Sequence, residues 1–300
     1  MLLGGFVIII VLGTGLLMLP AASATGQPVA FLDALFMATS AACVTGLAVV
    51  DVGADLSRFG QTVILLMIQI GGLGFMTFAV LIFLMLGKKI SFQQRLYIQE
   101  SLQQPAVEGV VRLARSVFLI AFALEAVGTG VLFVCWYPDL GSDALFTALF
   151  HAVAAFNNAG ISLWPDNLMR FVGDPVVNVT VTALVFIGSL GFTVLMDMWR
   201  NRRWSRLSLH SKLVLVTSFG LLGAGTLLLF LIELCNPLSQ TLTWPERVWG
   251  AYFQSVSRTS GFNTLDIGAL LPTSQFLLIL LMFVGASPGS TGGGIKTTTV

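Results

Sequence analysis

Residues 36–47 read FMATSAACVTGL, and two later stretches repeat the pattern, FHAVAAFNNAGI at 150–161 and FQSVSRTSGF at 253–262. Each is a run of small and apolar residues that ends in a glycine followed by a large apolar residue. A glycine at such a place lets the backbone leave a helix in a left-handed or extended conformation, so that its carbonyl groups can point at a ligand. Several such turns around one axis would form a ring of carbonyl oxygens, which can replace the water shell of an ion in a narrow pore.

The composition indicates a membrane protein with several spanning segments. Of the 300 residues, 56% are hydrophobic and only 10% are charged, whereas soluble domains carry about 25% charged residues. The lipid bilayer is therefore the expected environment. A formal net charge of +1 gives no indication of nucleic-acid binding. The three cysteines, Cys43, Cys135 and Cys235, lack metal-ligand spacing.

Long apolar runs and short inserts alternate along the chain. The long runs are 2–22, 60–86, 116–136, 176–199, 213–234 and 276–284 onward, and a spanning helix needs about 20 such residues. The inserts at 31–42, 143–156 and 245–257 are too short to span, and they predict helices that enter the membrane partway and return. The predicted fold class is an all-α membrane protein of tandem helix–pore-loop–helix repeats around a central pore.

Two basic loops separate three predicted repeats. The repeats occupy residues 1–86, 116–199 and 213–300, and the loops occupy 87–115 and 200–212. The loops contain most of the 15 basic residues, namely Lys88, Lys89, Arg95, Arg112, Arg115, Arg200, Arg202, Arg203, Arg206 and Lys212. Because positive residues concentrate in cytoplasmic loops, we expect both loops in the cytoplasm and the three inserts on the outer side. The expected location is the cell inner (plasma) membrane, crossed several times.

Five motifs together resemble the potassium-translocating membrane subunit of the Trk/Ktr/HKT superfamily, most closely its KtrB-type (TrkH-like) members. They are VTGLAVVD at 44–51, QIGGLGFMT at 69–77, NNAG at 157–160, RTSGFNT at 258–264 and SPGSTGGGIKTTT at 287–299. The resemblance covers essentially the whole chain. It implies potassium uptake, four repeats around a pore, a homodimer of the membrane subunit and a cytosolic nucleotide-binding regulatory subunit of the KtrA/TrkA type. It implies no bound cofactor, potassium as the transported ion, and sodium as a candidate coupling or activating ion. Since three repeats fall within the sequence, we expect it to be part of a longer protein.

The candidate selectivity filter consists of the backbone carbonyls at and just before each glycine. These residues are Val44, Thr45 and Gly46, then Asn158, Ala159 and Gly160, then Thr259, Ser260 and Gly261. Only the glycine is common to the three, so the predicted ring is chemically uneven. Replacing any of the three glycines with serine is expected to weaken discrimination of potassium over sodium. The third insert is two residues shorter between its phenylalanine and its glycine than the other two, so its geometry is expected to differ.

A glycine-rich stretch interrupts the sixth apolar run and is a candidate gate. Its residues include Ser287, Gly289, Ser290, Thr291, Gly292, Gly293, Gly294 and Lys296. Four glycines and a proline cannot continue a stable helix, and irregular backbone at membrane depth occurs only where protein buries it or where it lines a cavity. The resemblance implies the intramembrane gating loop of the third repeat. A nucleotide-binding phosphate loop is the alternative, but Ile295 separates Gly294 from Lys296 and no strand precedes the run.

Several charged and polar residues at membrane depth have two interpretations each. Arg258 either points behind the filter and pairs with a carboxylate such as Glu246 or Asp266, or tunes the charge at the pore entrance. His151 is either hydrogen-bonded structurally or proton-sensing. Glu125 is either functional, or it is structural and then hydrogen-bonds to a neighbouring helix or stays protonated. We expect Glu233 to reach the interface and Asp197 to pair with nearby arginines.

A secondary transporter for another cation or a small solute is the alternative function, because broken helices and glycines at membrane depth suit both. Solute transporters usually break the spanning helices themselves, whereas here the glycines follow short inserts. An enzyme is not expected, because the sequence shows no paired carboxylates, serine–histidine pair or histidine cluster.

Overall fold

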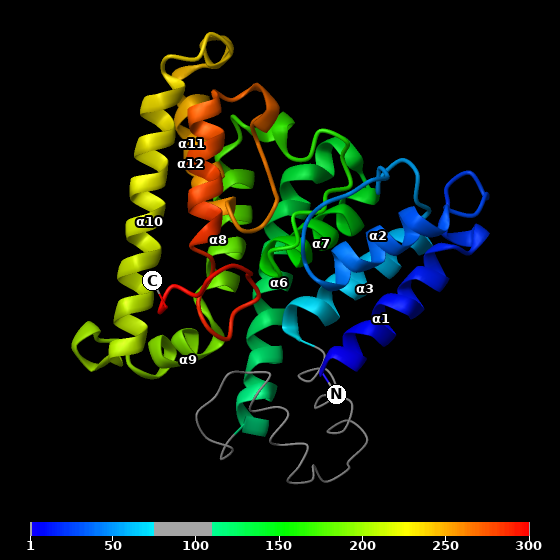
Figure 1. Ribbon diagram of the computed structural model, residues 1–300, viewed down its shortest axis with the longest axis horizontal. Coiled ribbons are helices and arrows are strands. Elements are labelled where there is room, and N and C mark those ends of the chain that lie inside the picture. The colour runs from blue at the N-terminus through cyan, green and yellow to red at the C-terminus, as the bar shows by residue number, and fades with distance from the viewer. Residues whose placement is uncertain (1, 75–109, 300) are drawn as a thin grey trace.

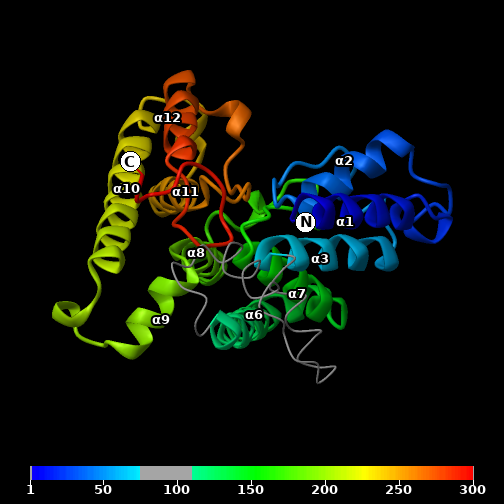
Figure 2. The same cartoon turned by 60° about the horizontal axis from the view of Figure 1, so that its bottom comes forward.

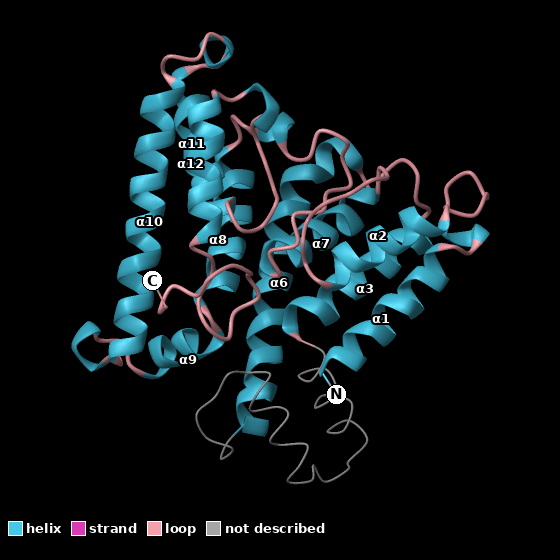
Figure 3. Ribbon diagram, in the orientation of Figure 1, coloured by secondary structure: helices cyan, strands magenta, loops and turns pink. Residues whose placement is uncertain are grey.

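The computed structural model describes residues 2–74 and 110–299, and these residues form helices joined by loops (Figure 3). The helices are α1 Leu2–Leu17, α2 Phe31–Ala42, α3 Arg58–Leu73, α6 Val110–Leu140, α7 Asp143–Phe156, α8 Pro175–Leu190, α9 Phe192–Arg200, α10 Leu209–Glu233, α11 Trp244–Ser257 and α12 Pro272–Phe283. Short 3-10 turns lie at Pro20–Ala22, Met169–Phe171, Trp204–Arg206, Leu238–Thr241 and Ile267–Ala269. The described part of the chain contains no β-sheet, only isolated bridges.

The helices form three groups around a common centre (Figures 1 and 2). In the first group α2 packs against α1 and α3, in the second α7 packs against α6 and α8, and in the third α11 packs against α10. In each group the middle helix is short and corresponds to one predicted insert. This arrangement confirms the all-α fold of tandem helix–pore-loop–helix repeats. The domain boundaries remain predictions, since most of the 87–115 loop and the end of the 60–86 run lie outside the described residues.

The three predicted inserts are helices with nearly the predicted bounds. The observed α2 and α7 begin and end where the sequence indicates, and α11 begins one residue earlier, at Trp244. At the start of α11 the Glu246 carboxylate accepts bonds of 2.8 Å from the Thr243 N–H and hydroxyl. These bonds stabilise the charged form of the carboxyl and hold the pKa of Glu246 below its ordinary value. The same bonds define the first turn of the helix.

Two of the inserts end in the same way and the third does not. The N–H of Thr45 bonds to the Ser40 carbonyl (2.9 Å) and the N–H of Ala159 bonds to the Ala154 carbonyl (2.8 Å). This six-residue closure needs a left-handed residue after the helix cap, and Val44 (φ 55°) and Asn158 (φ 59°) supply it. After α11 the shorter insert closes with a tighter bond from the Ser260 N–H to the Ser257 carbonyl (2.8 Å). The expected difference of the third insert is thus observed.

The predicted span at 176–199 is interrupted by a glycine. Helices α8 and α9 meet at Gly191 (φ +89°) with a bend of 95°. Helix α3 ends at Gly74 with nearly the same backbone angles, φ 83° and ψ 133° against φ 89° and ψ 138°. The two glycines lie in the related stretches IGGLGF at 70–75 and IGSLGF at 187–192. Within the described residues, α6 from Ala114 and α10 are each long and apolar enough to cross a membrane unbroken.

Candidate functional site

The three repeated glycines meet at one point in the centre of the described structure. All three have left-handed backbones, with φ of 85° at Gly46, 63° at Gly160 and 85° at Gly261. A Cβ atom added at Gly46 would lie 2.6 Å from the Ala159 carbonyl oxygen, and one added at Gly160 would overlap the Ser260 carbonyl oxygen. A Cβ at Gly261 would lie 3.3 Å from Gly46 Cα and 3.5 Å from Gly160 Cα. Residues more than 100 positions apart in the sequence thus bring their backbones into contact.

The short helices deliver these glycines with their C-terminal ends facing the centre. Helices α2, α7 and α11 each end four residues before their glycine, and none carries a basic residue in its last turn. The C-terminal end of a helix carries a partial negative charge, which favours a nearby cation. We call the segments 44–46, 158–160 and 259–261 the first, second and third glycine strands. Their environments are uneven, as expected. Asn158, Ala159 and Gly160 are all buried, whereas Thr45 and Gly261 are exposed.

An asparagine that the sequence interpretation missed also contacts two of the three glycines. The Asn167 side-chain amide donates to the carbonyl oxygens of Gly160 (3.3 Å) and Gly261 (3.4 Å). Asn167 itself has a left-handed backbone, with φ of 56°. It lies in the loop after the second repeated stretch, where the sequence carries no motif that would single it out.

The glycine-rich stretch forms a closed loop directly below the second glycine strand. Helix α12 ends at Phe283, as the composition predicts, and the base of the loop is closed by a bond from the Gly285 N–H to the Ile295 carbonyl (2.9 Å). The Lys296 ammonium group donates to the carbonyl of Gly292 within the same loop (2.9 Å). The side chain of Lys296 therefore folds back on the loop. Ser290 similarly donates to the carbonyl of Ser287 (2.6 Å).

The break at Gly191 creates the surface on which this loop docks. Because α8 stops there, its last carbonyls lack helical partners, and loop N–H groups take their place. The N–H of Ser287 donates to the Ser189 carbonyl (3.0 Å) and that of Thr291 donates to the Gly188 carbonyl (3.1 Å). In the reverse direction the Phe192 N–H, just past the break, donates to the Gly289 carbonyl (2.9 Å).

One threonine connects the loop to the second glycine strand. The Thr291 hydroxyl donates to the Phe156 carbonyl at the end of α7 (2.9 Å) and accepts from the Asn158 amide (2.9 Å). Gly188 makes room for this arrangement, since a Cβ there would overlap the Phe156 carbonyl and lie 2.9 Å from the Thr291 hydroxyl oxygen. The candidate filter and the candidate gate are therefore in direct contact.

The sequence matches the TrkH family, described as a cation transport protein, over residues 5–300. The chain belongs to this family. Among its relatives, Ktr system potassium uptake protein B of Bacillus subtilis is 49% identical, with 98% of this chain and 66% of that protein covered. Ktr system potassium uptake protein B of Vibrio alginolyticus is 41% identical, with 95% of this chain and 63% of that protein covered. Potassium/sodium uptake protein NtpJ of Enterococcus hirae is 38% identical, with 99% of this chain and 66% of that protein covered.

The fold of this TrkH-family chain also matches a solved structure. The potassium transporter TrkH from Vibrio parahaemolyticus superimposes with a TM-score of 0.71 at 20% identity, over 98% of this chain and 59% of that chain. The likeness supports a common arrangement of helices. The chain spans slightly less than two thirds of the length of the relatives that it matches.

A buried carboxylate connects three helices of this TrkH-family chain behind the second glycine strand. Glu125 of α6 is 2% exposed, and its oxygens accept from the amide groups of Gln69 on α3 (2.9 Å) and Asn157 after α7 (3.2 Å). Asn157 also donates to the Gln69 side-chain carbonyl (2.8 Å). Of the two interpretations of Glu125, the structure shows the hydrogen bonds to neighbouring helices. The sequence interpretation missed Gln69 and Asn157 as members of this network.

Replacing Glu125 with leucine is expected to destabilise the protein by about 1–3 kcal/mol, because it removes the acceptor of the buried Gln69 amide and one acceptor of Asn157. Glu125→Gln retains one carbonyl acceptor and is expected to lose less stability. Thermal unfolding of the detergent-solubilised full-length variants measures the difference. Equal melting temperatures for the leucine and glutamine variants would show that the acceptor oxygens contribute nothing.

The predicted ion pair of Arg258 is wrong, although the side chain does turn away from the three glycines. Its guanidinium group donates to the Leu281 carbonyl on α12 (3.1 Å) and to the Ser255 carbonyl (3.3 Å). Within the described residues the salt bridges join Arg58 to Asp143 and Arg170 to Asp166, and neither includes Arg258. Carbonyl groups near a helix C-terminus are good partners for a cation, which explains why no carboxylate is needed.

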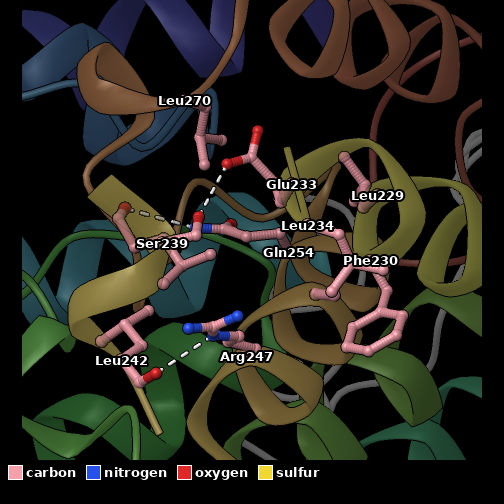
Figure 4. A pocket seen from close by; sticks show the side chains of 11 residues that line it. Leu229, Phe230, Glu233, Leu234, Ser239, Leu242, Arg247, Gln254 and Leu270 are labelled. Carbon is pink, nitrogen blue, oxygen red and sulfur yellow. Dashed lines mark hydrogen bonds between the residues drawn. The ribbon is translucent and has the colours of Figure 1, made fainter. Parts of the chain in front are cut away.

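The expectation that Glu233 reaches the membrane interface is also wrong. Glu233 is 8% exposed and lines a small cavity of about 20 Å³ between α10 and α11, large enough for about one water molecule (Figure 4). Its carboxylate accepts from Asn236 (2.7 Å), Ser239 (2.9 Å), Ser274 (2.5 Å) and the Leu271 N–H (3.1 Å). Four donors compensate for the lost hydration and hold the end of α10 and the start of α12 together.

Two further predictions can be compared with the structure. His151 is buried, and its ring nitrogens contact the Thr147 carbonyl (2.8 Å) and the Ser162 hydroxyl (3.0 Å), as expected of a structural histidine. Asp197 forms no ion pair within the described residues, contrary to expectation. Its carboxylate accepts instead from Ser211 (2.5 Å), the Ser208 N–H (2.9 Å) and Asn201 (2.8 Å).

Proposed function

We propose that this chain is the ion-translocating membrane subunit of a Trk/Ktr-type system and takes up potassium across the cytoplasmic membrane. The meeting of Gly46, Gly160 and Gly261 at the ends of three short helices carries this proposal. Carbonyl groups next to such glycines can coordinate a dehydrated cation without a side-chain charge. The names of the relatives, two of them potassium uptake proteins, support potassium as the cargo.

The filter consists in this proposal of the carbonyls of Val44 to Gly46, Asn158 to Gly160 and Thr259 to Gly261. The loop at 286–299 is the gate, supported by its contact with the foot of the second filter strand. The break at Gly191 removes one sequence argument against a solute transporter, since a spanning segment is interrupted after all. The convergence of the three glycines still favours a filter for a bare ion over a larger solute site.

The remaining assignments follow from the family. The three inserts face the outside of the cell and the basic loops face the cytoplasm, with Lys88, Lys89 and Arg95 outside the described residues. The membrane subunit is a homodimer that binds a cytosolic nucleotide-binding subunit of the KtrA/TrkA type. Sodium is a coupling or activating ion, and the name of the Enterococcus hirae relative, a potassium/sodium uptake protein, supports this assignment.

Growth of a bacterium that lacks its own potassium-uptake systems tests the proposal. We expect the full-length gene, expressed with its regulatory subunit, to restore growth at limiting potassium, and the empty vector to fail. Uptake of rubidium as a tracer in the same cells measures the transport step directly. Absence of both growth and tracer uptake, with the protein present in the membrane, would refute the potassium-uptake proposal.

A further inference from the structure

Asn167 occupies a position that connects two of the three filter strands. Its amide nitrogen lies 3.3 Å from the Gly160 carbonyl oxygen and 3.4 Å from the Gly261 carbonyl oxygen. One neutral donor therefore contacts the key carbonyls of the second and third repeats, which are separated by about 100 residues in the sequence. The oxygens of both carbonyl groups therefore face the Asn167 amide nitrogen.

The surroundings of Asn167 fix which way its amide points. The side-chain oxygen accepts from the Asn263 N–H (3.3 Å), so the nitrogen is the atom that faces the two carbonyls. The backbone is held as well, because the Leu168 N–H donates to the Asn263 carbonyl (3.1 Å) and the Ser162 hydroxyl donates to the Asn167 carbonyl (3.3 Å). Asn167 is thus oriented by bonds to the loop that follows α7 and to the loop that follows α11.

The backbone of Asn167 is itself in a restricted conformation. With φ of 56° it is left-handed, which glycine, asparagine and aspartate tolerate better than other residues. Non-glycine residues in this region are held by their surroundings and cluster at functional sites. The local bonds described above supply that restraint here.

We propose that Asn167 is a positioning residue that sets the orientation of the Gly160 and Gly261 carbonyls and so contributes to the choice between monovalent cations. A carbonyl oxygen that already accepts a hydrogen bond is less free to move towards a small ion. Without the amide, the two carbonyls can close around sodium at less cost, and discrimination by the filter falls. The inference rests on the proposed function of the three glycines.

Two substitutions distinguish the effect of the Asn167 side-chain amide from the effect of its left-handed backbone conformation. Asn167→Gly removes the side chain while it keeps the left-handed conformation accessible. Asn167→Asp keeps the size and the conformational tolerance but replaces the donor with an oxygen. In the full-length protein with its regulatory subunit, we expect both variants to reduce potassium-over-sodium discrimination about fivefold, the effect of losing a typical hydrogen bond. The measurement is tracer uptake with sodium as competitor, with the KM for potassium and the maximal rate determined separately.

A matched control tests whether any disturbance of the outer loops has the same effect. Asn263→Ala removes a side-chain bond to the Leu265 carbonyl (3.0 Å) but leaves the Asn263 N–H that orients Asn167. This control is expected to discriminate like the wild type. Melting temperatures of the purified variants show whether each one is folded.

The results separate this inference from the proposed function. Wild-type discrimination by both Asn167 variants, or an equal loss in the Asn263→Ala control, would overturn the role of the amide. If wild-type protein transports potassium and Gly160→Ser loses selectivity while the Asn167 variants do not, only the inference about Asn167 fails. If the wild-type protein transports no potassium, the proposed function itself fails.

Discussion

Replacing Gly160 with serine is expected to abolish most of the discrimination between potassium and sodium. Gly160 has the most crowded position of the three glycines, because a Cβ there would overlap the Ser260 carbonyl oxygen and lie 2.6 Å from Gly261 Cα. Its φ of 63° adds about 1–2 kcal/mol of strain for a serine. Since backbone atoms form both contacts, no flexible side chain can give way. The Ser260 and Gly261 carbonyls must move, and the third filter strand moves with them.

Competition experiments in the full-length protein measure this effect. We expect sodium to compete with tracer uptake at least tenfold better in the Gly160→Ser variant than in the wild type, which corresponds to about 1.4 kcal/mol. Gly223→Ser in α10 is the matched control, because a Cβ at Gly223 meets nothing within 4 Å. Unchanged sodium competition in the folded Gly160→Ser variant would contradict the assignment of Gly160 to the filter.

The sequence predicted the three re-entrant helices well because their determinants are local. Length and composition distinguish α2, α7 and α11 from spanning helices, and the glycines mark where each chain leaves its helix. The meeting of Gly46, Gly160 and Gly261 followed from repetition and from the family resemblance. The different geometry of the third insert was predicted from the shorter spacing between its phenylalanine and its glycine. In the structure this insert closes with a tighter turn, from the Ser260 N–H to the Ser257 carbonyl.

The errors concern contacts that neither the hydropathy nor the charge pattern of the sequence encodes. Hydropathy cannot distinguish an unbroken span at 176–199 from one broken at Gly191, because the break depends on bonds to a loop about 100 residues away. Arg258 and Glu233 were assigned partners by charge, yet helix-end carbonyls satisfy Arg258, and amides and hydroxyls satisfy Glu233. Asn167 has no sequence signal at all, since its importance comes from contacts with Gly160 in its own repeat and with Gly261 and Asn263 in the third repeat.

Replacing Thr291 with valine is expected to open the proposed gate. The valine has nearly the same shape but cannot donate to the Phe156 carbonyl or accept from the Asn158 amide, bonds that are both 2.9 Å long in the native protein. Thr291 is 8% exposed, so water cannot readily replace the lost partners. Leaving such groups unpaired costs about 1–3 kcal/mol in the docked state of the loop. In a two-state gate a shift of 1.4 kcal/mol changes the ratio of open to closed forms about tenfold.

Uptake by Thr291→Val should therefore have a higher maximal rate and depend less on the regulatory subunit than uptake by the wild type. Thr291→Ser keeps the hydroxyl and is expected to behave like the wild type, which separates the hydrogen bonds from the packing of the methyl group. Thr217→Val in α10 removes a hydroxyl that bonds only within its own helix, and controls for the loss of a membrane threonine. The maximal rate is the decisive quantity, because a gate changes the fraction of open pores while a filter changes the competition between ions. An unchanged maximal rate in folded Thr291→Val, with and without the regulatory subunit, would mean that the loop docks on α8 without closing the ion path.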